Sequence, residues 1–330
     1  LDGLQRLNAI VGFIENQFSW KQKYFDVNQL ARAKQAEKDG LFVGYHGGSV
    51  LENERCANFL DYQLAVTSFK VEDEEQIFEI FGRINSGGRQ LSNQEKRQAG
   101  VICDFSNVVR VIAADIRGDS TNESVLLSDM PQISIGSSRN NEQYGLKAEN
   151  TFWVKQGILA VQDLRNSDDE EVIADIVISV LMEEPFARSK EKLDRAYDLS
   201  SELYEKISIS LMRYTPEKLK LDIQNTFSVI KNCVESVTDE PNYLRNIVTP
   251  KARIPIKNAF YTIFMAFFEL LVKKDLSPCD SVKILHSLTD LQSRIKVETH
   301  YATTEGRRKN IALTVGLLEQ NFVKKEPSAL

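Results

Sequence analysis

Near its start the chain combines an acid, a glycine and an arginine where a helix begins, a pattern suited to binding a phosphate. The stretch is LDGLQRL at residues 1–7, in which Asp2 is placed to cap the helix and Arg6 lies in its first turn. Free backbone N–H groups at a helix start attract anions, and an arginine adds charge-assisted hydrogen bonds. We therefore predict a phosphate-compatible site around Asp2, Gly3 and Arg6.

A second stretch, FEIFGRINSGGRQLSNQEKR at residues 78–97, places polar residues at a corner between two predicted helices. The first helix is indicated by apolar residues at helical spacing, namely Ile77, Phe78, Phe81 and Ile84. The corner is the breaker cluster from Asn85 to Gly88, and Ser92 with Glu95 has the spacing of a capping box that starts the second helix. Arginines and lysines stand on both sides of the corner. A bound phosphate and an ordinary helix–turn–helix with a solvated basic face both fit this pattern.

Together the two stretches resemble the family of domains that forms the first half of the GmrSD restriction enzymes and of SspE-type phage-defence proteins. Members carry DGQQRL, which reads DGLQRL here, and F-x-R-I-N-x-G-G-x-x-L-x-x-x-E-x-R, which reads FGRINSGGRQLSNQEKR at residues 81–97. The chain departs from the first motif at Leu4, where the family has glutamine. Segments 126–136 and 151–158 are also similar to segments of some members.

The resemblance implies a ParB/sulfiredoxin-like α/β domain that handles a nucleotide or phosphodiester, followed by a helical domain. Transferred by position, it implies catalytic roles for Asp2, Arg6 and Glu95, with Asp2 or Glu95 holding a divalent metal or positioning a water. It implies nucleotide binding by Gly3, Gln5, Arg83, Asn85, Gly87, Gly88 and Arg89. The expected ligand is ATP or GTP, with Mg²⁺.

The helices and strands expected along the sequence would position these residues. They indicate an α+β, mostly helical chain, with an α/β domain at residues 1–115 and a helical bundle at residues 116–330. In the first domain we expect a short helix over 27–36, two short strands around the turn from Tyr45 to Gly48, and a strand over 62–71. His46 in that turn is read as a turn residue or as a proton carrier. In the second domain, helix starts are predicted at Ser167 with Glu170, Ser189, Thr215 with Pro216, and Ser277 with Pro278.

Composition excludes strong bulk attraction to nucleic acid, because the 330 residues carry a net charge of −6. A DNA contact would have to be a local basic patch, and two are present. The loop predicted over 243–258 supplies Lys251, Arg253 and Lys257, and the start of the last helix supplies Arg307 and Arg308. A solvated surface is the alternative for both patches.

The sequence lacks the motifs that several common catalytic mechanisms require. There is no Gly-Lys dipeptide for a P-loop, no acid followed two residues later by lysine, and only three histidines without zinc or H-N-H spacing. Four cysteines far apart in sequence indicate neither a zinc site nor a disulfide framework, and favour a cytoplasmic protein. The longest apolar run, 259–272, is too short for a membrane span and predicts a buried helix.

The leading hypothesis is a cytoplasmic restriction or anti-phage defence protein that binds and hydrolyses a nucleotide and acts on or senses DNA. If the chain cuts DNA, its nuclease must be of the D-G-x-x-R type. The competing hypothesis is a non-catalytic nucleotide- or DNA-binding module that partners a separate nuclease subunit or forms a homo-oligomer. A protein-interaction scaffold without a phosphate ligand is the third.

Overall fold

The computed structural model describes residues 4–62, 92–98, 103–118, 135–136, 146–251, 253–295 and 303–324. The chain divides into two compact units, one of residues 1–90 and 119–149, the other of residues 91–118 and 150–330. The prediction of a mostly helical α+β chain is confirmed. The predicted corner at 85–88, with the helix before it, and the strand predicted over 62–71 lie outside the described residues, apart from Tyr62.

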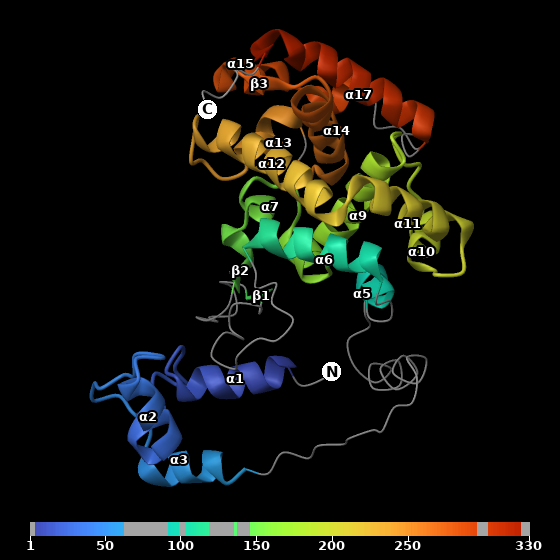
Figure 1. The fold of residues 1–330 in the computed structure, drawn as a ribbon. Coiled ribbons are helices and arrows are strands. Elements are labelled where there is room, and N and C mark those ends of the chain that lie inside the picture. Colours follow the sequence, from blue (N-terminus) through green and yellow to red (C-terminus); the bar gives the residue numbers. More distant parts are fainter. Residues whose placement is uncertain are drawn as a thin grey trace, which may run out of the picture. The chain divides into compact units, whose positions relative to one another are not determined.

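The division between the units differs from the predicted boundary at residue 115. Helices α5 (Asn93–Gln98) and α6 (Asp104–Arg117) pack against α9 (Asp168–Leu181), and α6 also packs against α12 (Pro216–Glu235). These contacts make α5 and α6 part of the helical unit, as Figure 1 shows for α6 beneath α12. The described part of the second family motif therefore belongs to the helical unit.

The first unit has three described α-helices and a small aromatic core. Its elements are α1 (Leu4–Ile14), η1 (Val27–Gln29), α2 (Ala31–Lys38) and α3 (Asn53–Leu60), with the parallel pair β1 (Ile135–Gly136) and β2 (Leu146–Lys147). Phe13, Phe25, Leu51 and Cys56 form the buried core. The ring centroid of Phe13 lies 5.3 Å from that of Phe59 and 6.1 Å from that of Phe25, both at edge-on angles.

The hairpin predicted around Tyr45 to Gly48 is wrong. Among the described residues there, only Val50 forms a β-bridge, and its partner is Tyr24. Glu37 holds the loop around Gly44 and His46 in place. Its Oε1 accepts the N–H of Gly44 at 2.9 Å and lies 2.7 Å from Nε2 of His46. His46 therefore contacts a carboxylate of α2 within a loop rather than a strand turn.

The second unit is built around α14 (Lys257–Phe268), whose residues from Ala259 to Phe268 are all buried. A helix that is apolar on every side must be surrounded by others. Helices α9, α12 and α17 (Thr304–Leu318) pack against it, and α17 is the red helix of Figure 1. The buried helix predicted over 259–272 is confirmed, with the last turns wound as the π-helix η5 (Glu269–Lys273).

The remaining elements of this unit are short helices and one antiparallel strand pair. They are η4 (Ala148–Asn150) at the unit boundary, α7 (Phe152–Lys155), α8 (Val161–Arg165), α10 (Lys190–Tyr197), α11 (Glu202–Tyr214), α13 (Tyr243–Val248), α15 (Ser281–Ser287), α16 (Leu291–Arg294), η6 (Glu319–Asn321), β3 (Leu276–Pro278) and β4 (Phe322–Lys324). Because α13 is helical, the loop predicted over 243–258 is limited to the residues after Val248.

Predicted helix starts are confirmed where the cap is local. The hydroxyls of Ser189 and Thr215 accept the N–H groups of Lys192 and Lys218, and Pro216 opens α12. The start predicted at Ser277 is wrong, because Ser277 pairs with Val323 in a strand and Asp280 caps the helix instead. Helix α9 begins where predicted, but Ser167 has a φ of 61° and its side chain makes no capping hydrogen bond.

Candidate functional site

The first motif runs into the first turn of α1. This helix begins at Leu4, so the backbone of Gln5 and Arg6 lies in its first turn, where a helix start was predicted. Asp2 and Gly3 lie outside the described residues, as do the side chains of Gln5 and Arg6. Within this helix Leu7 is exposed and Phe13 is buried.

In the second motif, Ser92 and Glu95 form the predicted capping box. The Oε2 atom of Glu95 accepts the N–H of Ser92 at 2.6 Å, and the hydroxyl of Ser92 accepts the N–H of Glu95 at 3.1 Å. Glu95 thus stabilises the start of α5. Arg83, Asn85, Gly87, Gly88 and Arg89 lie outside the described residues.

Arg97, the last residue of the second motif, is buried in the helical unit. Its Nε donates to Asp194 at 2.7 Å, and its Nη1 donates to Glu171 at 3.1 Å and to Gln94 at 3.2 Å. A guanidinium held by two carboxylates has little capacity left for a phosphate. The structure gives this motif residue a role in joining α5 to α9 and α10.

The acidic start of α9 is the centre of a network of ion pairs that the sequence did not indicate. Its carboxylates meet cations from four other parts of the helical unit: Asp168 with Lys257 at 2.7 Å, Asp169 with Arg117 at 2.9 Å, Glu171 with Arg97 at 3.1 Å, and Asp175 with Arg307 at 2.7 Å. Burial raises the pKa of the Asp169 carboxyl, and the Arg117 guanidinium opposes this shift. The partners are 52 to 132 residues apart in sequence, so no local pattern could reveal them.

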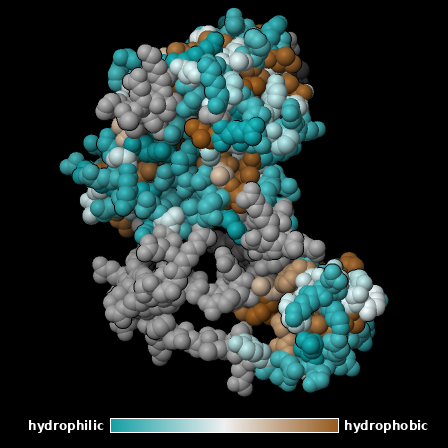
Figure 2. Space-filling model, turned by 180° about the vertical axis from the view of Figure 1, so that it is seen from behind, coloured by the Kyte–Doolittle hydropathy of each residue, from teal (hydrophilic) through white to brown (hydrophobic). Residues whose placement is uncertain are grey.

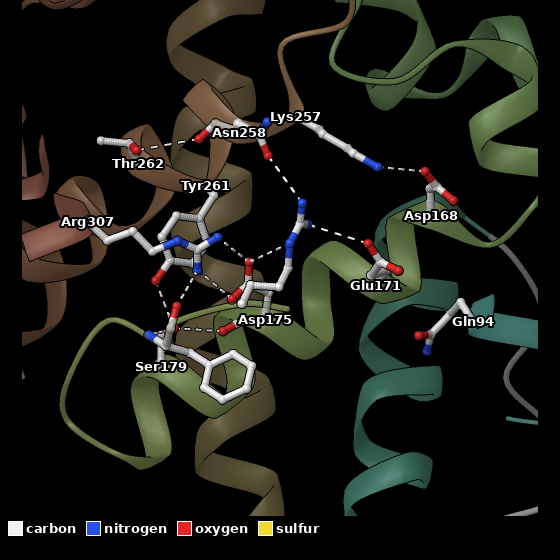
Figure 3. Close-up of polar contacts among 12 residues, drawn as sticks. Gln94, Asp168, Glu171, Asp175, Ser179, Lys257, Asn258, Tyr261, Thr262 and Arg307 are labelled. Carbon is white, nitrogen blue, oxygen red and sulfur yellow. Dashed lines mark hydrogen bonds and ion pairs between the residues drawn. The ribbon is translucent and has the colours of Figure 1, made fainter. Parts of the chain in front are cut away.

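The most buried pair joins α9 to α17 (Figure 3). Arg307 is 2% exposed; its Nη1 and Nη2 donate to the two carboxylate oxygens of Asp175 at 2.7 and 2.8 Å. Its guanidinium carbon lies 4.0 Å from the ring centroid of Tyr261, whose hydroxyl is 2.8 Å from that of Ser179. Burial raises the pKa of Tyr261 to about 12. This arrangement holds three helices together and presents no nucleophile to solvent.

The residues predicted to contact DNA differ in their exposure. Lys251 and Arg253 lie on the exposed surface, and Arg308 is exposed, with ion pairs to Glu305 and Glu184. Lys257 is partly buried against Asp168. Arg307 must be removed from this set, because its guanidinium is directed into the interior (Figure 3).

Two features are absent from the described part of the chain. No group of three or more histidine, cysteine, aspartate or glutamate residues could hold a metal ion there. No helix within the described ranges is long and apolar enough to cross a membrane.

Residues 1–102 match the family model of the GmrSD restriction endonuclease, N-terminal domain. The resemblance inferred from the two motifs is therefore confirmed for this part of the chain, which contains both of them. Neither the curated proteins nor the solved structures contain a match to this chain.

Proposed function

We propose that this chain, whose residues 1–102 match the N-terminal domain of GmrSD restriction endonucleases, is a defence protein that binds and hydrolyses a nucleoside triphosphate. The observation that carries the proposal is the pair of motifs within the matched residues. In this proposal Arg6 and Arg83 stabilise negative charge on the phosphates, and backbone N–H groups near Gly3, Gly87 and Gly88 assist them. Asp2 positions the attacking water.

Mg²⁺ would accompany the nucleotide, and its usual ligands are substrate phosphates with one or two carboxylates. The described residues contain no group of three metal-binding side chains. The proposed DNA contacts are Lys251, Arg253 and Arg308, because all three are exposed cationic residues. Their role would be to bind backbone phosphates and not to read sequence.

Replacing Arg6 with alanine should reduce the rate of ATP or GTP hydrolysis by roughly 10²–10³-fold, the usual effect of removing a group that stabilises transition-state charge. Hydrolysis is measured on the full chain with Mg²⁺, with and without DNA. Arg32→Ala is the matched control, because Arg32 is an exposed arginine of α2 in the same unit. Equal rates for the two variants would contradict a catalytic Arg6.

Substitutions of Glu95 can distinguish a helix-capping role from a catalytic role. Because glutamine also fits a capping box, Glu95→Gln should leave the melting temperature unchanged and the hydrolysis rate within about twofold of wild type. Glu95→Ala removes the acceptor of the Ser92 N–H and should cost about 0.5–1.5 kcal/mol of stability, the usual net contribution of one hydrogen bond. A Glu95→Gln variant that folds normally but loses hydrolysis would instead support the catalytic role that the family position implies.

The second candidate is a non-catalytic module that binds nucleotide or DNA beside a separate nuclease subunit. Leu4 favours it, because the family has glutamine there and leucine removes a polar group from the motif. Nucleotide binding without turnover, lost in Arg6→Ala, would support this candidate over the enzyme. Absence of nucleotide binding with and without DNA would contradict both.

A further inference from the structure

The first unit contains a pocket of about 510 Å³ between α1, the loop after it, and α3. Its floor is the aromatic cluster of Phe13, Phe18 and Phe59, and Ile10 adds an apolar wall. The lining also includes Arg55 and Asn58, two exposed polar residues of α3. Figure 2 shows hydrophobic residues of this unit gathered on one side of it. A largely apolar pocket with a few polar groups is the usual form of a small-molecule site.

Trp20 lies at the pocket, 44% exposed, and the backbone that presents it is strained. Trp20 and Lys23 exchange backbone hydrogen bonds of 2.9 and 3.0 Å across a two-residue turn. The turn residues Lys21 and Gln22 both have left-handed φ values, 50° and 64°. Residues other than glycine rarely adopt this backbone conformation. Such strain concentrates at functional sites, where the surrounding structure holds it in place.

Two contacts hold this turn and the pocket side chain Arg55 together. Lys23 forms an ion pair with Glu52, and the Nε of Arg55 lies 3.3 Å from the same carboxylate. The guanidinium carbon of Arg55 is 5.7 Å from the Trp20 ring centroid, and Nζ of Lys21 is 4.6 Å from it. The Arg55 guanidinium therefore lies over the Trp20 ring at the pocket, and a guanidinium can also stack on the planar ring of a ligand.

Position 6, where the backbone of the first motif is described, lies just before the pocket residues along α1. Position 6 precedes Ala9, Ile10 and Phe13 by three, four and seven residues, which is the spacing of neighbours on one helix face. Position 10 is one turn beyond position 6, about 6 Å along the axis. A nucleotide whose phosphates lie at the motif would have its base within reach of the pocket.

We propose that this pocket binds the base of the nucleotide; this rests on the proposed function, which places the phosphates at the Asp2 to Arg6 turn. The base would stack on the aromatic side chains, and Arg55 and Asn58 would bind its polar edge, since these side chain types commonly bond base edges. The phosphate site alone would not distinguish a nucleotide from inorganic triphosphate, whereas the pocket would.

Tryptophan fluorescence of the chain itself can test this proposal. It contains two tryptophans, and Trp153 is fully buried, so added nucleotide would alter the emission of Trp20. We expect a nucleoside triphosphate to change tryptophan emission saturably in the full chain, and inorganic tripolyphosphate to leave it unchanged. Arg55→Ala and Asn58→Ala, on exposed residues, should each weaken nucleotide affinity about tenfold, the effect of one lost base contact, without weakening tripolyphosphate binding. Arg32→Ala should bind like wild type.

The outcomes separate this inference from the proposed function. If hydrolysis occurs and depends on Arg6, but tryptophan emission does not respond and Arg55→Ala and Asn58→Ala keep the wild-type KM, the base pocket is refuted and the proposed function stands. Equal affinity for nucleotide and tripolyphosphate would also refute the pocket. If the chain neither binds nor hydrolyses any nucleotide, the proposed function fails and this inference fails with it.

Discussion

Replacing Arg307 with methionine should lower the free energy of unfolding of the helical unit by about 3–5 kcal/mol, the effect of breaking a buried ion pair. The change leaves the carboxylate of Asp175, itself 1% exposed, without the two hydrogen bonds of 2.7 and 2.8 Å. Arg188 does not replace them, because its Nε is 3.9 Å from Asp175 Oδ2, beyond hydrogen-bond distance. The carbonyl of Phe186 also loses its 2.7 Å hydrogen bond to Arg307.

The adjacent residue supplies a matched control. Arg308 has a 56% exposed side chain and two surface ion pairs, so Arg308→Met should cost no more than about 1 kcal/mol. Both variants can be compared by urea unfolding in a Trp20→Phe background, where Trp153 alone reports on the helical unit. Equal costs would contradict a buried Arg307 and would return it to the proposed DNA contacts.

A second variant tests the reason for the loss. If the cost arises from an uncompensated charge, replacing both partners with apolar residues should restore much of the stability. The variant Arg307→Met with Asp175→Leu is therefore expected to be more stable than Arg307→Met alone. A double variant that is less stable than the single one would indicate that the hydrogen bond to Phe186 and the contact with Tyr261 matter more than the charge balance.

Arg307 also shows why sequence patterns predicted some features of this fold and not others. Local signals were sufficient for the capping box at Ser92, the start at Thr215 and the buried helix over 259–272, because each depends on residues within one helix. The basic run at the start of α17 was interpreted as a surface patch, because its acidic partner Asp175 is 132 residues away. The start predicted at Ser277 failed for a similar reason, since that residue pairs with a strand near the end of the chain.

For the site, the motifs indicated where α1 starts, and the family match over residues 1–102 agrees with them. Trp20 and Arg55 were not predicted, because their proximity depends on a strained turn and on Glu52, which no short motif encodes. A tryptophan six residues after the end of an apolar helix is more often part of a core. Its exposure and the two cations over its ring are the observations that distinguish it.

The segment TFWVKQGI at residues 151–158 was similar to family segments but had no assigned chemistry, and the structure gives it a structural role. The carbonyl oxygens of Lys155, Gln156 and Gly157 accept the N–H groups of Asn242, Arg245 and Ile256 at 2.6, 3.2 and 3.2 Å. The side chain of Gln156 accepts the N–H of Leu244 at 3.1 Å, at the start of α13. This segment therefore positions the chain that leads into the core helix α14.

Replacing Gly157 with alanine should destabilise the helical unit by about 2–4 kcal/mol, since two separate costs combine. Gly157 has a φ of 67°, a left-handed conformation that is unfavourable for a residue with a Cβ atom. An added Cβ would also lie 2.8 Å from Asn242 Oδ1 and 2.9 Å from Arg245 Cδ. Both neighbours belong to the segment that the carbonyl groups of 155 and 156 hold, so relieving the contact would disturb those hydrogen bonds.

Gly316→Ala is the control, because this glycine lies within α17 and a Cβ there would meet no atom within 4 Å. Alanine is favoured over glycine inside a helix, so this change should stabilise the unit by about 0.5–1 kcal/mol. The two Gly→Ala variants should thus shift the urea midpoint in opposite directions, which a general effect of added methyl groups could not produce. If Gly157→Ala were as well tolerated as Gly316→Ala, the turn after α7 could adopt another backbone conformation, and its three carbonyl contacts would not determine the position of α13.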